Sequence, residues 1–180
     1  MSCPPVDPGV PGGRRTADVP DPPHVETPST PRSDSMAHGA DQQFLRMLSD
    51  HHLGMIQMAH AALRPDASAG LRAKAEEIHR KQHEEARQMA AMLERDFGDR
   101  YEPQVTPDNQ RMVERVRQAQ GAAAERTFYE ATVAHHEEGV RMMGEQLPHL
   151  ANPELRRMAE RMRDDQQREV GELRQTLAAA

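Results

Sequence analysis

The chain has no tryptophan, two tyrosines, three phenylalanines and a single cysteine among its 180 residues. One cysteine, Cys3, excludes an intramolecular disulfide framework. No stretch reaches the roughly 20 apolar residues that a membrane-spanning helix needs, and the N-terminal MSCPPVDPGV has no hydrophobic segment typical of a secretory signal. The net charge of -6 argues against nucleic acid as the main partner. These absences do not determine the cellular compartment of the protein.

Proline is concentrated at the N-terminus. Residues 1–33 hold nine of the 14 prolines and few large apolar residues. Such a segment cannot bury enough apolar surface to offset its ordering entropy. We therefore predict a disordered, Pro-rich tail over residues 1–39 and a single domain over residues 40–180.

The domain has helical periodicity and no strand-like alternation. Asp41 is the expected N-terminal residue of the first helix, Gly98 the stop of the second, and the third is expected to bend or break near Gly121. The pattern predicts an all-α antiparallel four-helix bundle built from two helix hairpins, with residues 108–121 as an extra connecting segment. The predicted helices span residues 41–63, about 70–97, about 108–147 and about 154–178.

A His-His pair occurs twice in matching surroundings. The pairs are His51-His52 and His135-His136, separated by 84 residues (135 − 51 = 84). Self-similarity at a fixed offset indicates a duplicated structural unit, with repeat one over residues 41–97 and repeat two over residues 125–178. The matches without a gap include Phe44 with Phe128, Met58 with Met142, Leu71 with Leu155, Gln82 with Gln166 and Glu85 with Glu169.

Helical geometry places the repeated polar residues on the apolar face. At about 100° per residue, His51 falls on the same stripe as nearby methionines, and His52 lies to one side of it. A Gln-x-x-Glu on the second helix of each repeat also falls on the inward stripe. A buried carboxylate without a partner is costly, so we expect these carboxylates to pair with histidines of the facing helix.

Two interpretations follow from this arrangement. In one, the His and Glu or Gln residues form an internal network that fixes how the helices pair. In the other, His and Met bind a metal while the Gln and Glu residues support them; imidazole with thioether suits Cu(I) best, and other transition metals stay open. The candidate ligands are His51, His52, Met47, Met55, Met58, His135, His136 and Met142, supported by Gln82, Glu85, Gln166 and Glu169.

The two copies are unequal in sulfur. Ala131 and Gly139 stand in repeat two where Met47 and Met55 stand in repeat one. If only one site binds copper tightly, it should be the first. Repeat one also carries His79 and His83, one helical turn apart and able to chelate a divalent ion. They are weaker metal candidates, which we expect to be solvated surface histidines.

These residues resemble a known family. The stretch from Phe44 to Met47, followed by HHLGMIQMA from His51, is similar to the signature of the domain of unknown function 305 family, as are the downstream Gln82-x-x-Glu85 and the two-repeat arrangement. The resemblance covers about residues 41–178. It implies a ferritin-like helical bundle, copper binding through the paired histidines and nearby methionines in some members, and a periplasmic or secreted location.

We therefore expect a metal-binding protein that is not an enzyme and that sequesters or transports copper, with the metal ion as its partner. One alternative is a purely structural or partner-binding helical bundle. Another is a ferritin-like di-iron oxidase, which would need two inward Glu-x-x-His motifs; the sequence offers only Glu76-x-x-His79, and Glu76 points away from the core stripe. Whether the chain forms a homo-oligomer stays open.

Overall fold

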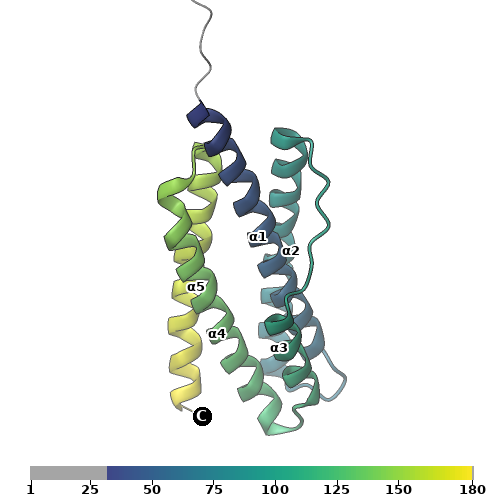
Figure 1. Ribbon diagram of the computed structural model, residues 1–180. Helices are drawn as coiled ribbons and strands as arrows, with labels where there is room; N and C mark the ends of the chain where they lie inside the picture. Colours follow the sequence, from purple (N-terminus) through teal and green to yellow (C-terminus); the bar gives the residue numbers. More distant parts are fainter. Residues whose placement is uncertain (1–31, 180) are drawn as a thin grey trace, which may run out of the picture. The chain divides into compact units, whose positions relative to one another are not determined.

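The computed structural model describes the backbone of residues 32–179 and the side chains of residues 38–179. Most of the predicted tail, up to residue 31, lies outside the described residues. The part of the chain that is described contains α-helices and a single 3₁₀ turn and no strand, so the all-α prediction is confirmed. The elements are α1 (Arg32–Ala62), α2 (Ala69–Phe97), α3 (Pro107–Gln118), α4 (Ala122–Gln146), η1 (Leu147–His149) and α5 (Pro153–Ala179) (Figure 1).

The helices pack as a bundle in which each repeat forms a hairpin. Helix α1 packs against α2, and α4 packs against α5 (Figure 1). The short α3 lies against α1 and α4, and α1 also contacts α4 directly. The bundle is therefore held together across the repeats by α1, α3 and α4.

The helix ends follow the turn chemistry of the sequence. Ser68 begins α2 by accepting a hydrogen bond from the Leu71 N–H at 3.0 Å. Gly98 ends α2 in the left-handed conformation, with φ of 63°, and donates its N–H to Glu94 O. Gly121, with φ of 55°, separates α3 from α4, so the expected break near this residue is confirmed.

Helix α1 begins earlier than predicted, at Arg32 instead of residue 41. No proline occurs between Pro31 and Pro65, so the sequence between them contains no helix-breaking residue of this kind and α1 continues back to Arg32. Asp41 is consequently an interior residue of α1. Its carboxylate accepts hydrogen bonds from the N–H groups of Ala151 and Asn152, at 2.9 and 2.8 Å, and so fixes the loop before α5.

A polar layer divides the core of the bundle. One apolar cluster surrounds Phe44, and the other surrounds Phe128. Between them along each long helix lie buried polar residues: His51, His52, Gln82, Glu85, His135, His136, Gln166 and Glu169. Among the described residues, no helix combines the length and apolar character needed to cross a membrane.

Candidate metal centre

The inward carboxylates are paired with histidines in both repeats. Glu85 Oε2 lies 3.0 Å from His52 Nε2, and Glu169 Oε2 lies 3.0 Å from His136 Nε2. These contacts confirm the predicted pairing between facing helices. Burial alone would raise the pKa of Glu169, but the hydrogen bond from His136 and the charges of Lys81 and Lys74 outweigh it and hold the pKa below its ordinary value.

The other two histidines meet between the repeats. The rings of His51 and His135 are stacked, with centroids 3.7 Å apart and planes 20° from parallel. Burial, reinforced by repulsion from His52 and His136, lowers the pKa of His51 to about 3. Burial also lowers the pKa of His135 well below its ordinary value. Both rings are therefore neutral near pH 7, and each carries one nitrogen lone pair.

The Nε2 atoms of these two rings have different surroundings. His135 Nε2 lies 3.1 Å from the backbone carbonyl oxygen of His51; since a carbonyl only accepts, this nitrogen is the donor. His51 Nε2 is buried and has no hydrogen-bond partner. A buried polar atom without a partner costs about 1–3 kcal/mol. The same cost applies to the unpartnered Nδ1 atoms of His135 and His136, so the surroundings of each histidine decide which is the best candidate ligand.

Gly139 on α4 makes room for this nitrogen. A Cβ at residue 139 would lie 2.7 Å from His51 Nε2 and 2.5 Å from Gln166 Oε1. Neither amide atom of Gln166 has a hydrogen-bond partner. Two unpartnered polar groups from different helices therefore converge on the space that the missing side chain leaves.

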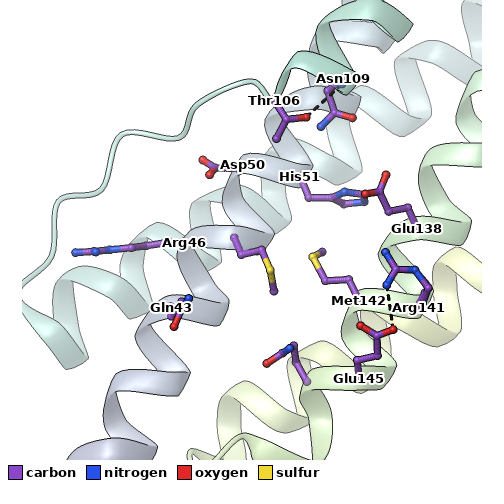
Figure 2. Close-up of a pocket in the computed structure, with 12 residues that line it drawn as sticks. Gln43, Arg46, Asp50, His51, Thr106, Asn109, Glu138, Arg141, Met142 and Glu145 are labelled. Carbon is purple, nitrogen blue, oxygen red and sulfur yellow. Dashed lines mark hydrogen bonds and ion pairs between the residues drawn. The ribbon is translucent and has the colours of Figure 1, made fainter.

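His51 also lines a hollow of about 440 Å³ between α1 and α4. Met47 lines it from α1 and Met142 from α4. Figure 2 shows His51 and Met142 reaching into the hollow from opposite helices, and Glu138 also lines it. The hollow thus brings a neutral imidazole together with two thioether side chains, and we call Met47, His51 and Met142 the α1–α4 site.

The remaining predicted ligands lie elsewhere. Both ring nitrogens of His52 are engaged, Nδ1 with Leu48 O at 2.9 Å and Nε2 with Glu85. His136 uses Nε2 on Glu169, whereas its buried Nδ1 has no partner. Met55 and Met58 are fully buried in the cluster around Phe128 and do not line the hollow.

Three features of the site were missed from the sequence. Gly139 was interpreted only as the loss of a methionine, although the Met-to-Gly difference between the repeats was the available signal. Glu138 and Arg141, which line the hollow, gave no signal because exposed charges are common on helices. Across residues 38–179, no three His, Cys, Asp or Glu side chains are gathered to hold a metal ion.

The chain belongs to the DUF305 family, a domain of unknown function whose family model matches residues 41–177. Among solved structures, a DUF305 fragment from Deinococcus radiodurans is 28% identical, with a TM-score of 0.68, over 78% of this chain and 97% of that one. CopM in its Cu(I)-bound form is 23% identical, with a TM-score of 0.66, over 77% of this chain and 96% of that one.

CopM co-crystallised with silver is also similar, with 23% identity and a TM-score of 0.63 over 77% of this chain and 96% of that one. At this level of identity the likeness to CopM establishes the fold alone. A comparison with curated proteins found no match.

Proposed function

We propose that this protein binds Cu(I) at the α1–α4 site and serves to sequester or carry the metal without catalysing a reaction. The observation that carries the proposal is the buried, unpartnered Nε2 of His51, a residue that lines the same hollow as Met47 and Met142. An imidazole nitrogen and two thioether sulfurs from two helices would make up a three-donor set.

The chemistry of this donor set favours a soft, singly charged ion. Thioether sulfur selects Cu(I) over harder ions, and imidazole binds copper well. All three donors are neutral, because the pKa of His51 is lowered to about 3. Glu138 also lines the hollow, and its negative charge favours a cation there; Glu145 is paired with Arg141 at 2.9 Å.

A role in holding or handing on copper fits the position of the hollow. The hollow lies between two helices and is reached by exposed residues such as Glu138 and Arg141, so metal can enter without unfolding of the bundle. Structures of the similar protein CopM contain Cu(I), Cu(II) and Ag, of which Cu(I) and Ag are soft ions. The proposal includes a ferritin-like four-helix arrangement that arose by duplication of one His-His hairpin.

The test is an anaerobic titration of tag-free protein with Cu(I) against a competing chelator. We expect one tightly bound Cu(I) per chain, and loss of that binding in the Met47→Leu/Met142→Leu double variant. Leucine conserves the volume of methionine closely, so the change removes sulfur with little effect on packing. Ag(I) should behave in the same way, whereas Zn(II) should be indifferent to the double variant.

A matched control replaces two methionines of the core. Met89 on α2 and Met158 on α5 are buried in the cluster around Phe44 and do not line the hollow. The Met89→Leu/Met158→Leu variant should bind Cu(I) as the wild type does. Equal Cu(I) affinity in the wild type and the Met47→Leu/Met142→Leu variant would show that the buried network is purely structural.

A further inference from the structure

A second group of histidines lies on the outside of the bundle, where α1 and α2 run side by side (Figure 1). His79 and His83 of α2 have ring centroids 4.6 Å apart, and His60 of α1 has its ring centroid 6.3 Å from that of His79. His60 and His83 are exposed, and His79 is half-buried. None of the three is part of the polar layer or the α1–α4 site.

The separations fit imidazoles that share one metal ion. With metal–nitrogen bonds of about 2.0 Å, two rings on one ion have centroids between roughly 4.5 Å, at a right angle, and 6.5 Å, when opposed. His79 and His83 fall at the lower end of this range, and His60 with His79 at the upper end. As placed, the three rings do not converge on one point, but the exposed rings of His60 and His83 can rotate.

The surroundings leave nitrogen lone pairs free for a metal. Partial burial and repulsion from His83 and His60 lower the pKa of His79, which favours its neutral, metal-binding form. Among the described residues, the side chains of His60, His79 and His83 make no hydrogen bond or ion pair; His60 accepts one from the Leu63 N–H through its backbone carbonyl. Metal binding therefore breaks no existing side-chain contact.

The donor set differs in kind from that of the α1–α4 site. It contains imidazole alone, with no thioether, and it is open to water. Imidazole with water suits borderline divalent ions, and the Irving–Williams order gives Cu(II) the highest affinity among them. Two histidines at i and i+4 on one helix face are a known way to chelate such an ion.

We infer that His79 and His83 chelate a divalent transition metal ion, best Cu(II), with His60 as a third ligand after rotation of its side chain. The inference does not rest on the proposed Cu(I) function, because the two sites share no residue and bind ions of different oxidation state. The chain would then bind Cu(II) on its surface and Cu(I) between its repeats.

The experiment is a Cu(II) titration, by calorimetry and electron paramagnetic resonance, of tag-free protein carrying Cys3→Ser, Met47→Leu and Met142→Leu. These substitutions remove the thiol and the thioethers of the α1–α4 site. We expect one bound Cu(II) with nitrogen hyperfine structure. His79→Ala/His83→Ala should lower the affinity at least about tenfold, since even the loss of a residue behind a ligand costs 10–100-fold.

The controls separate the three histidines from histidines in general. His149→Ala removes a histidine of η1, outside this group, and should leave Cu(II) affinity unchanged. His60→Ala should lower the affinity less than the double variant does; an unchanged affinity would overturn its role as third ligand. Equal Cu(II) affinity with and without His79 and His83 would overturn the site itself, whatever the Cu(I) titration shows.

Discussion

In repeat one, the Nε2 atom of His51 is buried without a partner beside a hollow, whereas in repeat two the same atom of His135 is hydrogen-bonded to the backbone carbonyl of His51 at 3.1 Å. The carboxylate pairs behind them are alike, each with a nitrogen–oxygen distance of 3.0 Å. The repeated motif therefore keeps its supporting pairs in both copies. Of the two stacked histidines only His51 lines the hollow, whereas the unpartnered nitrogen of His135 is its Nδ1.

Two substitutions between the repeats and one difference in burial accompany this difference. Met47 has Ala131 as its counterpart, so repeat two lacks one thioether. Met55 has Gly139, and the absent side chain on α4 is what leaves space next to His51 Nε2. Met58 has Met142, but Met58 is fully buried while Met142 lines the hollow. These differences make the surroundings of His51 and His135 unequal.

The largest expected effect on Cu(I) affinity comes from replacing each of the two stacked histidines by glutamine, in separate variants. His51→Gln should lower Cu(I) affinity at least about 100-fold, because it removes a ligand and not merely its support. His135→Gln keeps a donor for the His51 carbonyl and should change the affinity less than about threefold, which is under 1 kcal/mol. Anaerobic competition titration measures both, and circular dichroism checks folding. Equal losses of Cu(I) affinity in the two variants would mean that His51 and His135 contribute equally to binding.

Filling the space at Gly139 should have a smaller effect. Gly139→Ala places a Cβ 2.7 Å from His51 Nε2 and 2.5 Å from Gln166 Oε1, so both groups must shift. We expect Cu(I) affinity to fall about tenfold, or about 1.4 kcal/mol. The control is Gly144→Ala on the same helix, where an added Cβ meets nothing within 4 Å.

Gly144→Ala should leave Cu(I) affinity unchanged and raise the free energy of unfolding by about 0.5–1 kcal/mol, because alanine is the better helix former. If Gly139→Ala binds Cu(I) as tightly as the wild type, the space beside His51 is not part of the site.

The carboxylate of repeat two should make stability depend on pH. The pKa of Glu169 is lower in the folded protein than its ordinary value of 4.5. Its stabilising contribution is therefore complete above about pH 4.5 and is lost as the pH falls through the folded pKa. Glu169→Gln should weaken this acid-induced loss, as measured by urea unfolding between about pH 6 and pH 3.

Glu160→Gln, on the same helix but exposed, is the control for this measurement. It should follow the wild type across the whole pH range. The same pH dependence in Glu169→Gln and the wild type would show that Glu169 gains nothing from His136, Lys81 and Lys74 on folding.

Sequence periodicity predicted the inward residues well because the spacing of residues along a helix determines on which side of the helix each side chain lies. Gln82, Glu85, Gln166 and Glu169 were expected to face inward and are all buried. The helix ends at Gly98 and Gly121 were predictable because glycine adopts positive φ readily, and both residues do have positive φ. The helical hairpins of the two repeats also follow from short loops between amphipathic segments.

The choice of ligands could not be predicted in this way. His51 and His135 have the same projection, and only their packing against each other decides which Nε2 bonds to a carbonyl. Met55 and Met47 lie on the same face of their helix, yet only Met47 lines the hollow. Which of them meets a neighbouring helix depends on the angle at which the two helices cross. The role of Asp41 in fixing the loop before α5 was missed for the same reason.

The smallest effect on metal binding is expected from restoring sulfur to repeat two. Ala131→Met supplies the thioether that Met47 provides in repeat one, but His135 Nε2 still donates to the His51 carbonyl. Ala131 is only 2% exposed, so the larger side chain should lower stability by about 1–3 kcal/mol through overpacking. Titration should still give one Cu(I) per chain, because His135 is completely buried and added sulfur alone does not give a metal ion access to it. A second tightly bound Cu(I) would show instead that sulfur content alone separates the two repeats.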